Sequence, residues 1–251
     1  MHALRPWDAG DRHPRPPVPL TPCPDPPIPP RAIDDVVQDS EDATHPKRYI
    51  EGKDIEQWFT PTRRFLEWGT RRAPRKFARQ TFPELHEAAE KLMTIVVTAG
   101  SPPVMFDDMK RFTTHTSCIF VQWHALAGVK NKSLRKAARY KGEKPPRPDL
   151  PKRERLEDIS RHFAVKYLLA VMNSTAARDF LSANRRSNLH LYPDDWKQLP
   201  IPDVPPEKQT PIVTLVDEVL DAKRRDPAAD TTASERKIDR MVSKLYGLTR
   251  E

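Results

Sequence analysis

The segment His190–Pro205, HLYPDDWKQLPIPDVP, interrupts the helical pattern of the second half of the chain. Its four prolines disfavour both a helix and a central strand, so we expect Leu199–Pro202 to run extended. Trp196, Leu199 and Ile201 lie within the same stiff segment. This combination predicts a rigid strap, anchored by three apolar side chains, that connects packed parts of one fold.

Strand patterns dominate residues 48–123, and helical patterns dominate from Leu156 onward. We expect strands within 63–70, 91–98, 104–107 and 116–123, with 91–107 forming a hairpin. Helices are expected over 156–183, interrupted at Asn173-Ser174, then from Pro211, and after a capping box at Thr232 and Glu235. Segregated strands and helices predict the α+β class, with a mixed β-sheet followed by a helical part.

Composition divides the 251 residues into three regions. Residues 1–45 are rich in proline, and this composition predicts a disordered tail. Residues 46–155 should form a β-rich part with a basic loop, and residues 156–251 a helical part. Only two cysteines and no long apolar run are present, so we expect a cytoplasmic protein with no membrane segment.

The net charge of +8 is unevenly distributed. Residues 130–155 hold eleven Lys and Arg against three acidic residues, and residues 63–79 hold seven against Glu67 alone. Such an excess indicates a polyanionic partner, and a solvated surface is the alternative reading. The candidate phosphate-binding residues are Arg71, Arg72, Lys76, Arg79, Lys130, Lys132, Arg135 and Lys136.

A search for catalytic motifs finds none that we would defend. No two glycines have the Gly-x-Gly spacing of a loop that binds phosphate or a methyl donor. Asp25-Pro-Pro-Ile28 approaches the Asp-Pro-Pro-aromatic loop of amino-methyltransferases but lacks the ring. Asp25 with Glu51-Gly-Lys53 matches a loose nuclease pattern only by chance, and the histidines lack metal-ligand spacing. We therefore expect no catalytic residue, cofactor or metal on this chain.

The order of several short motifs resembles a known domain. These motifs are RYIEGKDIEQW, RFLEWG, VMFDD, KYLLAVMNS, LYPDDWKQLPIP and KIDRMVSKLYGLT. Together, over about residues 47–251, they resemble the TaqI-like C-terminal specificity domain. That domain occurs in adenine-N6 DNA methyltransferases, fused restriction–modification enzymes and BREX-type phage-defence methyltransferases. The motif order, rather than any single motif, carries the resemblance.

The resemblance implies a DNA target-recognition domain whose partner is double-stranded DNA. It also implies that S-adenosylmethionine binds to a missing catalytic domain or to a separate methyltransferase chain. PPEKQTPIVTLVDEVL is similar to a segment of type I restriction specificity subunits. One alternative is a protein-interaction subunit that docks through helices 211–223 and 234–246, and another is an enzyme with a divergent site.

Overall fold

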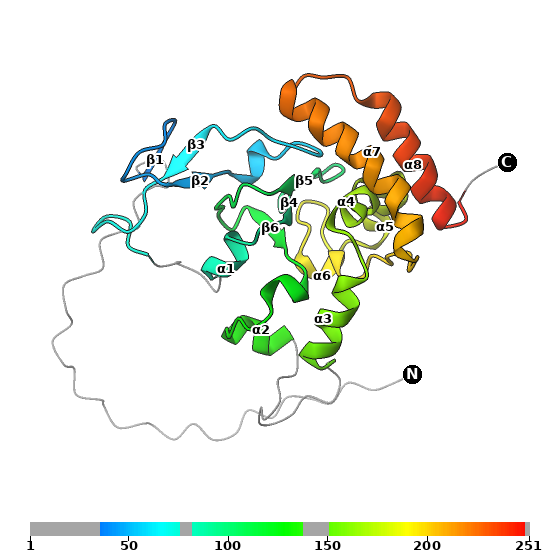
Figure 1. Ribbon diagram of the computed structural model, residues 1–251, viewed down its shortest axis with the longest axis horizontal. Helices are drawn as coiled ribbons and strands as arrows, with labels where there is room; N and C mark the ends of the chain where they lie inside the picture. Colours follow the sequence, from blue (N-terminus) through cyan, green and yellow to red (C-terminus); the bar gives the residue numbers. More distant parts are fainter. Residues whose placement is uncertain (1–35, 76–81, 138–150, 249–251) are drawn as a thin grey trace. The chain divides into compact units, whose positions relative to one another are not determined.

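The computed structural model describes residues 36–75, 82–137 and 151–248 (Figure 1). The predicted tail up to Asp35 lies outside this description, as do Lys76 and Arg79. The helices and strands confirm the α+β class. Val36–Glu251 forms one compact unit, so the β-rich and helical parts belong to a single body.

Two antiparallel sheets replace the single mixed sheet that the sequence predicted. The first has the order β1 (Val37–Gln38), β3 (Arg64–Leu66), β2 (Lys47–Tyr49), and the second has the order β5 (Val104–Asp107), β4 (Lys91–Ile95), β6 (Ser117–Phe120). The predicted hairpin is confirmed, because β4 pairs antiparallel with β5 and Met93 faces Met105. Short connections favour antiparallel pairing, and among the described residues parallel contacts occur only as isolated bridges.

Strand β1 lies inside the segment that we had assigned to the tail. Val37 pairs with Leu66, and the backbone N–H of Glu67 donates to Val36 O at 2.8 Å. The Asp42 side chain accepts from the backbone N–H of both Thr44 and His45, which closes the turn toward β2. The structure therefore contains a strand about ten residues before the point where we expected order to begin.

The predicted helical region 156–183 is three helices: α3 (Arg153–Arg161), α4 (Val165–Asn173) and α5 (Thr175–Asn184). Ser174 caps α5 as predicted, since its hydroxyl accepts from Ala177 N. Helix α7 (Pro206–Arg225) begins at Pro206, not at Pro211 as we expected. Pro206 fits the first helical position, whereas Pro211 lies on an exposed face and interrupts one backbone hydrogen bond.

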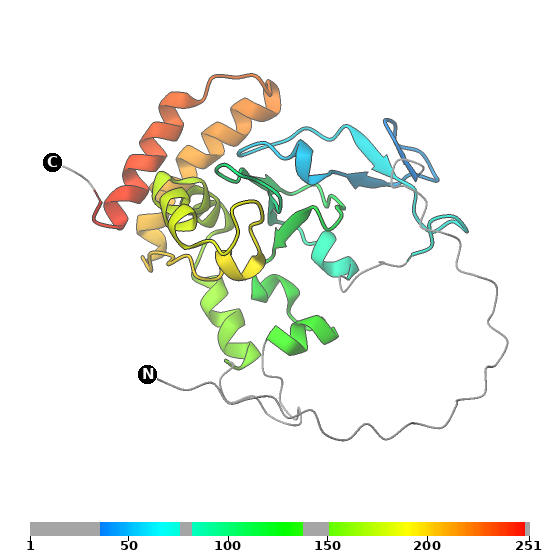
Figure 2. The ribbon, with the colours of Figure 1, turned by 180° about the vertical axis from the view of Figure 1, so that it is seen from behind.

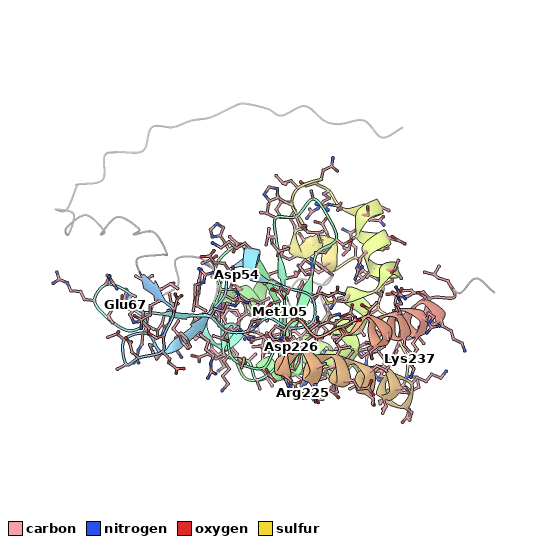
Figure 3. The ribbon with its side chains drawn as sticks, turned by 90° about the horizontal axis from the view of Figure 1, so that it is seen from above. Asp54, Glu67, Met105, Arg225, Asp226 and Lys237 are labelled. Carbon is pink, nitrogen blue, oxygen red and sulfur yellow. The ribbon has the colours of Figure 1, made fainter. Side chains whose placement is uncertain are left out.

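Helix α8 (Thr232–Leu245) also differs in detail from its prediction. Its N-cap is Thr231, whose hydroxyl donates to Glu235 at 2.5 Å, so the predicted Thr232–Glu235 capping box does not form. Three short helices complete the fold: α1 (Pro83–His86), α2 (Lys132–Ala137) and α6 (Pro193–Trp196). Arg225 and Asp226 mark the turn between α7 and α8 (Figure 3).

The proline-rich strap contains one helical turn that the sequence analysis excluded. Pro193 occupies the first position of α6, where a missing N–H costs nothing, and Asp195 accepts from Tyr192 N to cap it. The three predicted anchors are confirmed: Trp196 and Leu199 are buried in the main core, and Ile201 packs against it. Tyr246 and Tyr167 donate their hydroxyls to Pro200 O and Pro202 O, at 2.6 and 2.8 Å.

The main core joins the second sheet to the C-terminal helices. Leu92 and Phe106 of the sheet belong to the same buried cluster as Leu169 of α4, Val216 of α7 and Val242 of α8. The Asn173 side chain binds both the N–H and the C=O of Val104, at 3.1 and 2.8 Å. The apolar faces of α7 and α8 are thus used inside the chain.

Candidate nucleic-acid interface

Internal ion pairs engage two of the cations that the structure describes in the first basic run, Arg64 and Arg72. Arg72 binds the buried carboxylate of Glu67, and the hydrogen bond from Arg72 holds the pKa of Glu67 below its usual value. Arg64 pairs with Glu51 and Asp54. Of the residues we predicted to bind phosphate in this run, Arg71 is exposed, while Lys76 and Arg79 lie outside the described residues. Arg63, Arg71 and Arg75 are exposed and have no ion pair within the described residues, so this run keeps part of its positive charge.

A buried arginine organises the second basic run. Arg153, at the start of α3, is 5% exposed and donates to Leu126 O and, at 2.8 Å, to Val129 O. Its Nε also donates to Glu157 at 2.5 Å. These bonds hold the 3₁₀ helix Trp123–Leu126 and the residues after it against α3. The chain leading to Lys130 is therefore fixed beside the first turn of α3.

Two further contacts dock the same segment along α3. The Gln122 side chain donates to Ser160 O and Phe163 O, at 2.8 and 2.6 Å. The backbone N–H of His124 donates to Ser160 Oγ at 3.0 Å. Buried and half-buried polar contacts thus bring together residues that are 24 to 41 positions apart in sequence.

The result is a group of exposed cations that we call the α2–α3 basic cluster. Its members are Lys130, Lys132, Arg135, Lys152 and Arg155, all exposed. Figures 1 and 2 both show α2 beside the first turn of α3. Within the described residues, no ion pair neutralises Lys130, Lys132, Lys152 or Arg155. Of the nearby acids, Glu157 and Asp158 pair with Arg153 and Arg161, whereas Glu154 is exposed and has no ion pair within the described residues.

The structure brings three of the predicted phosphate-binding residues into one group with two further cations. Lys130, Lys132 and Arg135 fall in the cluster, whereas the side chain of Lys136 lies outside the described part of α2. Lys152 and Arg155 were not singled out, because only the bonds of Arg153 reveal that they join the same surface. Exposed cations on two elements can neutralise several phosphates of one duplex without reading its sequence.

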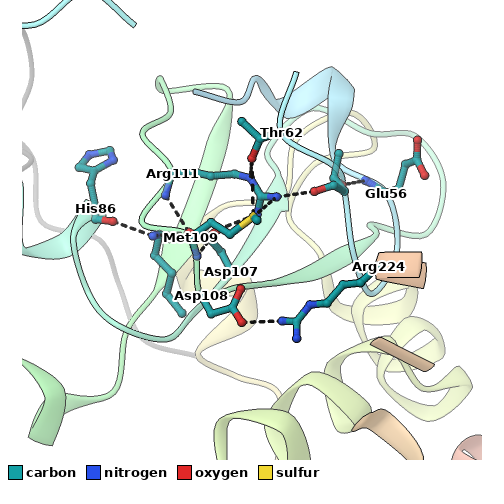
Figure 4. Close-up of polar contacts among 10 residues, drawn as sticks. Glu56, Thr62, His86, Asp107, Asp108, Met109, Arg111 and Arg224 are labelled. Carbon is teal, nitrogen blue, oxygen red and sulfur yellow. Dashed lines mark hydrogen bonds and ion pairs between the residues drawn. The ribbon is translucent and has the colours of Figure 1, made fainter. Parts of the chain in front are cut away.

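A second concentration of charge is buried and has a structural role (Figure 4). Lys91, Asp107 and Arg111 are fully buried, and Asp107 pairs with both cations. Burial alone would raise the pKa of Asp107, but Lys91 and Arg111 hold it below its usual value. Lys91 also donates to His86 O, and Arg111 to Thr60 O. This network joins β4, β5, α1 and the chain around Thr60.

A half-open hollow of about 350 Å³ lies beside this network. Lys47, Arg48 and Lys110 contribute cations to it, and Glu41 and Glu87 contribute carboxylates. Lys47 pairs with Glu87 at 2.6 Å and lies over the Phe112 ring. Because charges of both signs line the hollow, it is a weaker anion site than the α2–α3 basic cluster.

The described residues also include one buried thiol, Cys118. Burial raises the pKa of the Cys118 thiol to about 11, which leaves it a poor nucleophile. Within the described ranges, no group of three or more His, Cys, Asp or Glu side chains could hold a metal ion. Nor does any described helix combine the length and apolar character needed to cross a membrane.

No protein-family model matches the sequence, and no curated protein is significantly similar to it.

Proposed function

We propose that this chain is the DNA sequence-recognition module of a site-specific adenine-N6 DNA methyltransferase, within a restriction–modification or phage-defence system. The methyl donor, S-adenosylmethionine, and the catalytic groups belong to a separate domain or chain. The chain itself holds double-stranded DNA in a defined position. The α2–α3 basic cluster is the observation that carries this proposal.

The cluster supports a nucleic-acid partner in two ways. Its cations are exposed and, for Lys130, Lys132, Lys152 and Arg155, not matched by acidic partners in the described residues. It is also held in place by the buried guanidinium of Arg153, so the charges are presented on a fixed surface rather than on a loose strand. Preorganised charges bind a polyanion at a lower entropic cost than mobile ones.

The alternative of a protein-interaction subunit that works through its C-terminal helices has less support. Ile212, Leu215 and Val219 of α7 and Ile238 and Val242 of α8 are all buried in the main core. Those apolar faces are therefore occupied within the chain. The residues that are exposed on both helices are mainly polar and charged.

Duplex binding at several salt concentrations tests the proposal. Each phosphate neutralised changes the slope of log affinity against log salt by about −0.9, so four contacts contribute about −3.6. Changing Lys130, Lys132, Lys152 and Arg155 to Ala should flatten the slope by roughly 2 to 4 and weaken binding to all sequences alike.

The chain offers a control with the same composition. Lys208, Lys237, Arg240 and Lys244 are also three lysines and one arginine, all exposed, on α7 and α8 (Figure 3 labels Lys237). Changing these four to Ala removes the same net charge and should leave the slope within about one unit of the wild type. No duplex binding by the wild-type chain, or equal effects of both variants, would contradict the proposal.

A further inference from the structure

A short two-stranded ribbon extends β4 beyond the second sheet. Val97 forms an antiparallel bridge with His190. Thr98 N donates to Leu189 O at 2.9 Å, and Leu191 N donates to Val96 O at 2.8 Å. We call residues 96–98 with 186–192 the recognition ribbon. In Figure 2 the segment that leads into α6 lies on the near side of the folded unit.

The ribbon presents apolar side chains to solvent. Of the five large hydrophobic residues that are exposed in the described part of the chain, three belong to it: Val97, Leu189 and Tyr192, at 43%, 52% and 43% exposure. The His190 and Tyr192 rings are stacked, with centroids 5.8 Å apart. A concentration of exposed apolar groups on one element indicates a contact surface.

The ribbon is also rigid, which an ordinary exposed loop would not need to be. Ser187 Oγ accepts from the backbone N–H of Leu189 and His190, at 3.2 and 3.1 Å. The buried carboxylate of Asp195 accepts from Tyr192 N at 2.8 Å and from Arg186 Nε at 3.0 Å. The Arg186 guanidinium lies over the Tyr192 ring at 5.5 Å. The backbone of the ribbon and the Tyr192 ring are therefore held in place.

We propose that the recognition ribbon contacts base edges in the major groove of double-stranded DNA; this inference rests on the proposed function. The major groove is wide enough for a two-stranded β-ribbon. The ribbon offers side chains of the kinds that contact bases: the amide of Asn188, the imidazole of His190 and the apolar surface of Leu189, which suits a thymine methyl. A protein partner would use the apolar groups but would not require these polar ones.

The position of the ribbon agrees with this role. Trp196, directly after the ribbon, packs edge-on against Phe120 at the end of β6, with ring centroids 5.6 Å apart. The residues after Phe120 lead to Gln122, whose side chain is hydrogen-bonded to α3. Figures 1 and 2 both show α6 beside α3. The ribbon and the α2–α3 basic cluster are thus connected through packed elements, as one duplex contacting both would require.

Photocross-linking tests this inference on the full chain. The probe is a pool of duplexes with a randomised core in which 5-iodouracil replaces thymine, since the iodinated base cross-links to aromatic side chains that touch it. The expected result is a cross-link within residues 187–197, at His190 or Tyr192, together with enrichment of a preferred sequence. Leu189→Ala with Tyr192→Ala should lower that sequence preference by about tenfold or more while keeping the salt slope.

Two control variants complete the experiment. Leu248→Ala removes an exposed leucine far along the chain and should behave as the wild type. Tyr192→Phe keeps the ring and should retain both cross-link and preference. Failure of the wild type to bind any duplex would overturn the proposed function and this inference together. Duplex binding without a ribbon cross-link, or with the double variant unchanged, would overturn the ribbon's role alone and leave it as a surface for a protein.

Discussion

Replacing Asp107 with Asn should lower the free energy of unfolding by about 3–5 kcal/mol, the usual cost of breaking a buried ion pair. Asp107 is the one anion between two fully buried cations in this network. Its carboxylate pairs with Lys91, binds Arg111 Nη1 at 2.7 Å, and accepts from the backbone N–H of Met109 and Arg111. An Asn side chain has one acceptor oxygen and no charge, so both cations would stay buried and unneutralised.

Two comparison variants isolate this effect. Glu87→Gln breaks the more exposed pair with Lys47 and should cost no more than about 1 kcal/mol. Lys91→Met leaves Asp107 and Arg111 as a one-to-one pair and should cost clearly less than Asp107→Asn. Urea unfolding followed by circular dichroism measures all three variants. An Asp107→Asn variant within about 1 kcal/mol of the wild type, or no less stable than Glu87→Gln, would refute the assignment of this network as buried and structural.

Three further predictions follow from the fold. Deleting residues 1–45 should lower the melting temperature, because it removes β1 and the Asp42 turn. Deleting only residues 1–35 leaves both in place and should not lower it. Equal melting temperatures of the two deletion variants would contradict the β1 pairing. Burial lowers the pKa of His86 to about 4, so between about pH 6.5 and 4 the unfolded chain binds a proton that the folded chain does not, and stability falls on acidification. Between pH 7 and 5 the His86→Phe variant, which preserves stacking on Phe112, should lose about 2 kcal/mol less free energy of unfolding than the wild type. Identical pH profiles of the two proteins would refute this. Calorimetry should detect no micromolar binding of S-adenosylmethionine to the purified chain, and a measurable heat of binding at that level would place donor chemistry on this chain.

Local sequence patterns were sufficient for many of the elements. The β-rich run at Lys91, the hairpin over 91–107 and the capping residue Ser174 each predicted a feature that the structure contains. The apolar anchors of the strap were likewise recognisable, because large apolar residues in a proline-rich segment have few uses other than packing. These signals depend only on residues close together in the chain.

The missed features depend on distant partners. Lys91 would be read as a surface charge, and only the register that sets it opposite Asp107 explains its burial. Strand β1 is two residues long and gains its place by pairing with β3. The α2–α3 basic cluster requires Arg153 to reach Leu126 O and Val129 O across more than twenty residues. Neither periodicity nor composition encodes such contacts.

The most direct test of the central claim is a methylation assay on the complex that the tagged chain forms in its native host. The purified complex is supplied with labelled S-adenosylmethionine and random-sequence duplex DNA, and the modified bases are mapped. We predict adenine methylation within one short sequence, strongly reduced when Lys130, Lys132, Lys152 and Arg155 are changed to Ala and retained when Lys208, Lys237, Arg240 and Lys244 are changed instead. A complex that contains no methyltransferase, together with a chain that does not bind duplex DNA, would contradict the account.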